Sequence, residues 1–139
     1  MRERGPVSTL VFVYGTLMRG GCNHGFLRTA RFLGPARVKH VGLYQVSPAF
    51  PGAVREQNSV VRGELYQIDE PTLAALDRLE DEGYLYKREM LEVVMEETGV
   101  LVKAWVYLWR HGVSPETAVP LEEQPWCHRS RQENRKVDD

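Results

Sequence analysis

Residues 7–22 read VSTLVFVYGTLMRGGC. The first half, Val7–Tyr14, is dense in β-branched and aromatic residues, and its apolar residues fall on both faces, which predicts a central strand of a sheet. The second half, Gly15–Cys22, is rich in glycine and predicts a loop at the end of that strand. Such a loop exposes backbone N–H groups without bulky side chains, so it can bind a carboxylate or an oxyanion.

The regions that follow this loop alternate between helical and strand-like patterns. A short helix is expected from Asn23, a candidate N-cap, to Arg31. Two prolines in Ser47–Gly52 predict a constrained loop without regular strand pairing. Further strands are predicted at four places, the last two as a hairpin: Ala36–Val46, Val60–Ile68, Tyr86–Met95 and Val100–Trp109.

The clearest helix begins after Asp69, which is a plausible N-cap and is followed by a proline in the first turn. Its apolar residues Leu73, Leu76 and Leu79 recur at helical spacing, and Gly83 is the predicted stop. The resulting order β-α-β-β-α-β-β, with only two helices, predicts an α+β fold with a curved or barrel-like sheet.

Length and composition limit the class of protein. The chain has 139 residues, 42% of them hydrophobic and 27% charged. That is enough for one buried core, and it excludes a disordered chain and a second full domain. We expect a single domain over residues 1–139, with a core at about 7–112 and a polar tail at 130–139. No apolar run approaches the roughly 20 residues of a membrane helix, and no secretory signal is found, so a cytoplasmic protein without a membrane partner is expected.

The charges are divided unevenly along the chain. Residues 1–62 carry nine Lys/Arg and two Asp/Glu, a balance of +7, whereas residues 63–139 carry nine and seventeen, a balance of −8. The basic residues are scattered and lack the aromatic signature of RNA-binding modules, so no nucleic-acid partner is expected. The two halves are expected to neutralise each other within one fold.

Glu80 is the first candidate for chemistry. It follows Leu73 by seven residues and Leu76 by four, so the apolar stripe of the helix ends in a carboxylate that should face inward. Burial without a cation raises a carboxyl pKa toward neutrality, as a general acid or base requires. The alternative is a structural ion pair of Glu80 with Arg88, Arg78 or Lys87, and helix geometry alone does not exclude it.

Two other kinds of site find less support. The glycine loop lacks the Lys and the Ser/Thr of a nucleotide P-loop, because Gly21 and Cys22 stand in those places, which excludes ATP or GTP binding. Cys22 lies two residues from His24, and Cys127 precedes His128, so a Cys22-dependent amidase is conceivable. No C-x-x-C spacing is present, which argues against zinc, and two cysteines give little support to a disulfide framework.

Four segments of the chain, taken in order, resemble the gamma-glutamylcyclotransferase-like family, and its small gamma-glutamylamine cyclotransferases and their bacterial and plant relatives in particular. These segments are Val11–Leu17, Gly63–Tyr66, Leu76–Glu80 and Tyr86–Arg88. The resemblance implies a small mixed-strand barrel with flanking helices and a cavity at one end. One departure from the family pattern is that Asp81 and Glu82 follow the acid, where many members have Gly or Ser.

The resemblance also implies an activity and a site. The expected reaction is the cyclisation of a gamma-glutamyl amide to 5-oxoproline, with release of an amine or amino acid, without metal or cofactor. Glu80 would be the general acid/base. The residues expected to bind the small-molecule substrate are Tyr14, Gly15, Thr16, Leu17, Phe50, Pro51, Gly52 and Tyr86.

Two alternatives to this function stay open from the sequence. One is a non-catalytic protein that binds a small acidic metabolite, although a buried acid at Glu80 would repel such a ligand. The other is the Cys22-dependent amidase. The leaving group of the substrate and the oligomeric state are not determined by the sequence.

Overall fold

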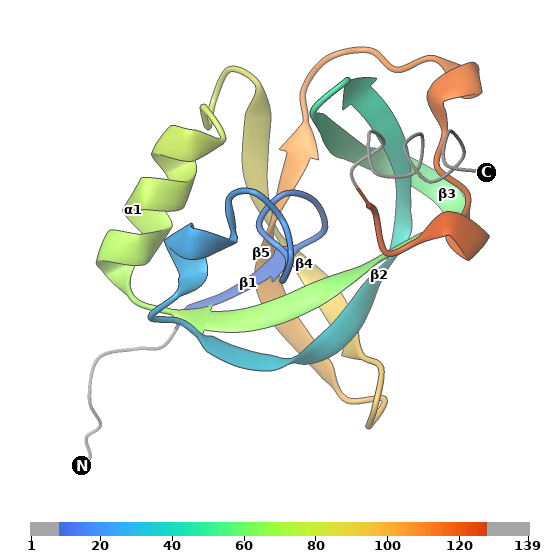
Figure 1. The fold of residues 1–139 in the computed structure, drawn as a ribbon. Helices are drawn as coiled ribbons and strands as arrows, with labels where there is room; N and C mark the ends of the chain where they lie inside the picture. The colour runs from blue at the N-terminus through green and yellow to red at the C-terminus, as the bar shows by residue number, and fades with distance from the viewer. Residues whose placement is uncertain (1–8, 128–139) are drawn as a thin grey trace, which may run out of the picture.

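Five strands close into a barrel in the part of the chain that the computed structural model describes, residues 9–127 (Figure 1). These strands are β1 (Thr9–Val13), β2 (Arg31–Ser47), β3 (Phe50–Ile68), β4 (Tyr86–Met95) and β5 (Leu101–Trp109). Their order around the barrel is β1-β3-β2-β4-β5. The parallel pairing of β1 with β5 closes the ring, whereas the other pairs of neighbours in this order are antiparallel. The predicted mixed barrel is confirmed.

The strand β1 is central, as the sequence predicts. It lies between β3 and β5, and its consecutive residues Val11, Phe12 and Val13 are all at most 3% exposed. Both of its faces are therefore buried, which explains why its apolar residues do not alternate with polar ones. Val7 and Ser8, with which the predicted strand begins, lie outside the described residues.

The prediction of an unpaired loop at Ser47–Gly52 is wrong. The turn between β2 and β3 comprises only Pro48 and Ala49, and Pro51 lies within β3 opposite Gln45. Proline is tolerated there because the only hydrogen-bonding group it lacks is the backbone N–H. Its backbone oxygen still accepts a hydrogen bond, from the Tyr86 hydroxyl at 2.7 Å. Both strands therefore extend well beyond their predicted bounds.

The helix predicted from Asn23 to Arg31 is also wrong. Only the short 3-10 helix η1 (His24–Leu27) forms, and β2 already begins at Arg31. The side chain of Asn23 makes no capping hydrogen bond, and its Nδ2 donates to Thr16 Oγ1 at 3.0 Å. This hydrogen bond ties the end of the glycine loop back to its beginning.

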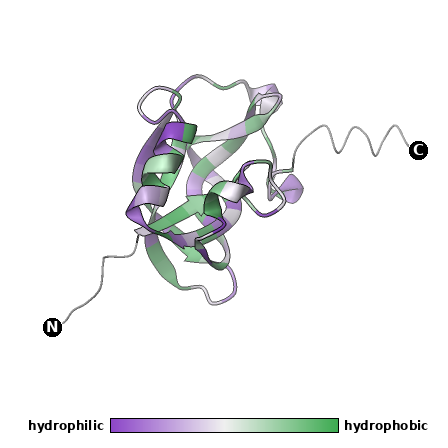
Figure 2. Ribbon diagram, turned by 60° about the vertical axis from the view of Figure 1, so that its left-hand side comes forward, coloured by the Kyte–Doolittle hydropathy of each residue, from purple (hydrophilic) through white to green (hydrophobic). Residues whose placement is uncertain are grey.

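The helix α1 (Glu70–Leu79) forms as predicted, and the Asp69 side chain caps it by accepting from the backbone N–H of Thr72 at 2.9 Å. It lies on one side of the barrel (Figure 1). Leu73 and Leu76 are buried against the core, and in Figure 2 the helix carries both hydrophobic and hydrophilic residues, as an amphipathic helix should. None of the helices in residues 9–127 has the length and apolar composition to cross a bilayer.

The predicted stop at Gly83 is displaced by two residues. Asp81, with φ of 53°, adopts the left-handed conformation just after the helix. Its N–H donates to the Arg78 oxygen at 3.2 Å, and the Glu82 N–H donates to the Asp77 oxygen at 2.9 Å. These two bonds make a Schellman motif, in which aspartate takes the place usually held by glycine. The motif fixes the backbone on both sides of Glu80.

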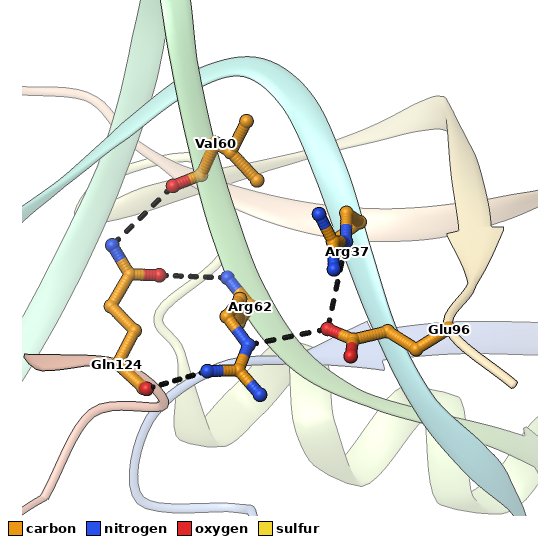
Figure 3. A network of polar contacts seen from close by, with 5 residues as sticks. All are labelled: Arg37, Val60, Arg62, Glu96 and Gln124. Carbon is orange, nitrogen blue, oxygen red and sulfur yellow. Dashed lines mark hydrogen bonds and ion pairs between the residues drawn. The ribbon is translucent and has the colours of Figure 1, made fainter. Parts of the chain in front are cut away.

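The segment after β5 packs on the other side of the barrel from α1 and includes the 3-10 helices η2 (Pro115–Thr117) and η3 (Leu121–Glu123) (Figure 1). Gln124, which is 7% exposed, accepts from the Arg62 N–H at 2.7 Å and donates to the Val60 oxygen at 3.3 Å (Figure 3). Arg62 also pairs with Glu96 at 3.2 Å. These bonds attach the segment to β3. The polar tail predicted at 130–139 lies outside the described residues.

We expect Gly63→Ala to lower the free energy of unfolding by about 1–3 kcal/mol. A Cβ at Gly63 would lie 2.2 Å from the Val13 carbonyl oxygen and 2.8 Å from Phe12 Cζ, so β1 and β3 would have to separate. Urea unfolding measures the change. Gly112→Ala is the matched control, because a Cβ there meets no atom within 4 Å. Equal unfolding midpoints for the two variants would contradict this account of the packing.

Candidate active site

A cavity of about 230 Å³ opens where β1 runs into the glycine loop. Its walls come from four parts of the chain: the end of β1 with the loop, the start of β3, the end of α1 and the β4–β5 hairpin. The lining residues are Phe12, Val13, Tyr14, Gly15, Thr16, Leu17, Cys22, Asn23, Ala49, Phe50, Pro51, Leu79, Glu80, Leu85, Tyr86 and Tyr107. The barrel thus brings segments that are far apart in the sequence around one space.

The cavity gathers eight of the nine site residues predicted from the sequence: Tyr14, Gly15, Thr16, Leu17, Phe50, Pro51, Glu80 and Tyr86. Gly52 is the exception. It lies outside the lining and packs against the Trp109 side chain, where an added Cβ would come within 2.8 Å of the Trp109 Cβ. Its role in this structure is close packing between β3 and β5.

Glu80 is the only carboxylic acid among the described residues that line the cavity. Its carboxyl group makes no hydrogen bond or ion pair with any residue from 9 to 127, and burial raises its pKa to about 7. The C-terminal end of α1, which carries partial negative charge, also disfavours an ionised carboxylate at this position. Glu80 therefore titrates in the range where a general acid/base operates.

The structural ion pair considered for Glu80 does not form. Arg88 is bound by Asp77, with Nε 2.8 Å from Oδ1 and an Nη 2.9 Å from Oδ2. Arg78 and Lys87 are exposed, and neither makes an ion pair with Glu80. The carboxylate is left free for a ligand in the cavity.

Three tyrosines line the cavity together with Glu80, and each of their hydroxyl groups donates a hydrogen bond to another part of the protein. Tyr14 donates to the Tyr107 backbone oxygen at 2.6 Å, Tyr86 donates to the Pro51 oxygen at 2.7 Å, and Tyr107 donates to Asp77 Oδ1 at 2.6 Å. Burial raises the pKa of all three, and the charge of Glu80 raises them further. They stay neutral at physiological pH and form a fixed wall around the acid.

The glycine loop has unpaired backbone donors in residues that line the cavity. Within residues 9–127, the backbone N–H groups of Gly15, Thr16 and Leu17 have no protein acceptor, whereas the Met18 N–H donates to the Gly15 oxygen at 3.1 Å and the Asn23 N–H to the Thr16 oxygen at 3.0 Å. These later bonds fold the loop and leave the first three donors available. Such a set of N–H groups suits a carboxylate or an oxyanion.

Position 15 needs a glycine because the Pro51 side chain lies too close for a Cβ atom. An added Cβ would lie 2.9 Å from Pro51 Cδ and 3.0 Å from Cγ, which belong to a rigid ring. Gly15 has no left-handed backbone conformation. The close approach of loop and strand, rather than an unusual φ, accounts for this glycine.

Cys22 lines the cavity but has no activating partner among the described residues. His24 Nδ1 lies 2.9 Å from the Leu17 backbone oxygen, and no hydrogen bond joins His24 to Cys22. His128 lies outside the described residues. From residue 9 to residue 127, no group of three His, Cys, Asp or Glu side chains is arranged as metal ligands. The geometry gives no support to a Cys22–His24 pair.

Sequence reasoning missed several lining residues, of which Tyr107 is the most informative. It lies directly opposite Arg88 in the β4–β5 pairing. Pairing the ends of the two predicted strands, Met95 with Val100, and counting outward would have found this pair. Leu79 also lines the cavity, and the apolar stripe of the helix predicted only that it faces inward. Leu85 and Asn23 line the cavity too, and no local pattern in the sequence marks them as site residues.

Comparisons with known proteins agree on one family. The profile described as "Gamma-glutamyl cyclotransferase, AIG2-like" matches residues 11–128. A Vibrio cholerae protein named "Putative gamma-glutamylcyclotransferase" is 37% identical, over 86% of this chain and 96% of its own length. A gamma-glutamylcyclotransferase family protein of Escherichia coli is 31% identical, over 87% and 98%. The crystal structure of a mouse AIG2-like protein is similar, with a TM-score of 0.70 and 31% identity, covering 81% of this chain and 83% of the mouse chain.

Proposed function

This chain belongs to the gamma-glutamyl cyclotransferase, AIG2-like family, and from that premise we propose that it cyclises a gamma-glutamyl amide to 5-oxoproline. The observation that carries the proposal is Glu80, an unpaired acid with a pKa of about 7 in a cavity that Gly15, Thr16 and Leu17 also line. The backbone N–H groups of these three residues have no acceptor in residues 9–127. The substrate is a small molecule, and the product pair is 5-oxoproline and an amine or amino acid.

The reaction needs no nucleophile from the protein. The Glu80 carboxylate takes a proton from the α-ammonium group of the substrate, and the amine nitrogen attacks the γ-carbonyl carbon. This forms a five-membered ring with a tetrahedral carbon and an oxyanion. The protonated Glu80 then gives its proton to the leaving nitrogen as the bond between carbon and that nitrogen breaks. The ring nitrogen passes its second proton to the departing amine, which leaves as an ammonium ion. One carboxyl group of raised pKa thus serves as base and then as acid.

The glycine loop supplies the electrostatic part of the mechanism. The N–H groups of Gly15, Thr16 and Leu17 would bind the α-carboxylate of the substrate or the developing oxyanion. No lysine, arginine or histidine lies among the described lining residues, so an anion in this cavity would be held by uncharged donors, the backbone N–H groups of the loop first among them. The neutral tyrosine wall and the apolar residues keep water from the acid.

Mass spectrometry of 5-oxoproline release tests the proposal. The purified protein is incubated with a panel of gamma-glutamyl amines and gamma-glutamyl dipeptides, and the expected result is release from at least one class. Binding of these compounds without release would favour the non-catalytic alternative. Neither binding nor release across the panel would contradict the proposed function.

We expect Cys22→Ala and treatment with a metal chelator each to change the release rate less than about threefold, since a group outside the proton transfer contributes little to the barrier. The substrate carries its own nucleophile, and Cys22 has no histidine partner in residues 9–127. The same assay measures both effects. Loss of activity on thiol alkylation, with protection by substrate, would support the amidase alternative instead.

A further inference from the structure

Glu64 lies outside the cavity lining but is bound to the glycine loop, which forms part of that lining. It belongs to β3, where it pairs with Val13, the last residue of β1. The glycine loop begins two residues after Val13 and returns to the same place on β3. There the Arg19 backbone N–H donates to Glu64 Oε1 at 3.0 Å, and Arg19 Nε donates to Oε2 at 3.2 Å. One residue of the barrel is thus paired with the chain on both sides of residues 15–17.

The other hydrogen bonds of the glycine loop are local. The backbone oxygens of residues 15–18 are all bound by groups of residues 18–24, either backbone N–H groups or the His24 ring. These bonds give the loop its shape but do not attach it to the barrel. Within residues 9–127, the two bonds between Arg19 and Glu64 are the only hydrogen bonds that join residues 15–22 to a strand.

The backbone bond of Arg19 is the stronger of the two attachments. The Glu64 side chain is only 12% exposed, and its Oε1 also accepts from the Tyr66 hydroxyl at 2.9 Å, so the carboxylate is held in one position. A backbone N–H that donates to a carboxylate makes a charge-assisted bond, which is stronger than a bond between neutral groups. The Arg19 side chain is 59% exposed, and an ion pair with so exposed a partner contributes little.

This attachment bears on substrate binding because of where Arg19 lies in the loop. Residues 15–17 line the cavity, and their N–H groups have no acceptor in residues 9–127. Arg19 follows them across a turn that the Met18 N–H closes on the Gly15 oxygen at 3.1 Å. Leu17 and Met18 are buried, so the loop stays packed on the core without Glu64, but with more freedom. A site that is correctly formed only part of the time binds its ligand more weakly in proportion.

We propose that Glu64 is a positioning residue for the substrate. By binding the Arg19 N–H to β3, it holds the N–H groups of residues 15–17 in the place where they bind the α-carboxylate of a gamma-glutamyl amide. This inference rests on the proposed function. Glu64 takes no part in the proton transfer, so its effect falls on substrate binding and not on the chemical step.

The test isolates the bond to the Arg19 N–H. Glu64→Ala removes the acceptor, and KM for a gamma-glutamyl amide should rise about five- to tenfold, with kcat within about twofold of the wild type. Arg19→Ala keeps the backbone bond and should leave KM within about twofold. In the Arg19→Ala background, Glu64→Gln keeps an oxygen for the N–H and should add little, whereas Glu64→Ala should again raise KM. If Glu64→Ala does not fold, Glu64→Asp, which is shorter by about 1.5 Å, should raise KM by a smaller factor.

A merely structural role gives a different pattern. Glu64→Ala would then lower the urea midpoint and leave KM unchanged, or would raise KM equally for a substrate whose α-carboxylate is amidated; either result would overturn the proposal. NMR relaxation of the backbone amides of residues 15–19 reads the attachment without turnover, and their order parameters should fall in Glu64→Ala but not in Arg19→Ala. If the wild type released no 5-oxoproline, the proposed function would fail, while relaxation would still decide whether Glu64 fixes the loop. Equal order parameters in the wild type and Glu64→Ala would overturn the inference on Glu64 alone.

Discussion

Glu80→Gln is expected to lower the rate of 5-oxoproline release by about two to four orders of magnitude, the usual contribution of general acid–base catalysis. Glutamine fills the same space but cannot take a proton from the α-ammonium group or return one to the leaving nitrogen. Since the Glu80 carboxyl group has no partner in residues 9–127, the substitution breaks no hydrogen bond of the described structure. Single-turnover and steady-state assays of 5-oxoproline measure the loss, and substrate affinity should change much less.

Glu82→Gln is the matched control for this substitution. Glu82 lies two residues away, outside the cavity lining, and its carboxylate accepts from the Arg88 backbone N–H. We expect this variant to retain release within about tenfold of the wild type, because only the turn is weakened. Near-normal activity of Glu80→Gln, or a larger loss in Glu82→Gln, would show that Glu80 is not the acid/base.

Glu80→Gln is also expected to change the stability of the protein in a way that depends on pH. The folded pKa of Glu80, about 7, lies above the unfolded value of 4.5, so the folded state binds more protons between these two pH values. Ionised Glu80 therefore costs the wild type stability as the pH rises from about 4.5 to 7. Glutamine does not titrate, so Glu80→Gln should be more stable than the wild type by about 1–3 kcal/mol at pH 8 and similar to it at pH 4.

Gly15→Val is expected to reduce kcat/KM by about a hundredfold, the cost of displacing a binding group by roughly 1 Å. The new side chain would collide with the Pro51 ring and push the loop away from the start of β3. The free N–H groups of Gly15, Thr16 and Leu17 would then point away from the position of the anion. The loss should appear mainly in KM, and circular dichroism should show that the barrel still folds.

Two comparisons make the Gly15 result specific. Gly25→Val introduces the same side chain into η1, where a Cβ meets no atom within 4 Å, and should leave kinetics unchanged. Substrates without the free α-carboxylate should lose affinity for the wild type but little more for Gly15→Val, because both changes remove one interaction. Full additivity of the two losses would show that the loop is only structural.

Much of the site could be predicted from the sequence because its parts are local. The Leu73, Leu76 and Leu79 stripe and the Asp69 cap are contained in one helix, and their spacing alone places Glu80 on the inward face. The glycine loop could be predicted for the same reason, because it follows β1 directly in the sequence. The full length of strand β3 was harder to predict, because a proline at position 51 argues against a strand. The proline is accommodated there with a hydrogen bond from the Tyr86 hydroxyl, which is 35 residues away in the sequence.

The missed features depend on contacts between distant elements. The helix predicted after Asn23 is cut short because β2 already begins at Arg31, where it pairs with β3, and helix propensity does not contain this pairing. The unpaired state of Glu80 depends on Asp77 capturing Arg88, so the sequence could not choose between an ion pair and a free acid. Both features depend on contacts that form only when the barrel closes.

The hydrogen bond from the Tyr14 hydroxyl to the Tyr107 backbone oxygen joins residues that are 93 positions apart. Some walls of the cavity are therefore synthesised early and others late. A growing chain that has just reached Glu80 has the acid and its helix but neither β4 nor β5. At about 5–20 residues per second, the ribosome adds the remaining residues up to 107 roughly one to five seconds later. Until then the cavity lacks the walls that Tyr86 and Tyr107 supply, so the burial that raises the pKa of Glu80 is expected to be incomplete. A chain that ends before β5 is therefore expected to lack both the raised pKa of Glu80 and the closed cavity, because one folding event completes the two.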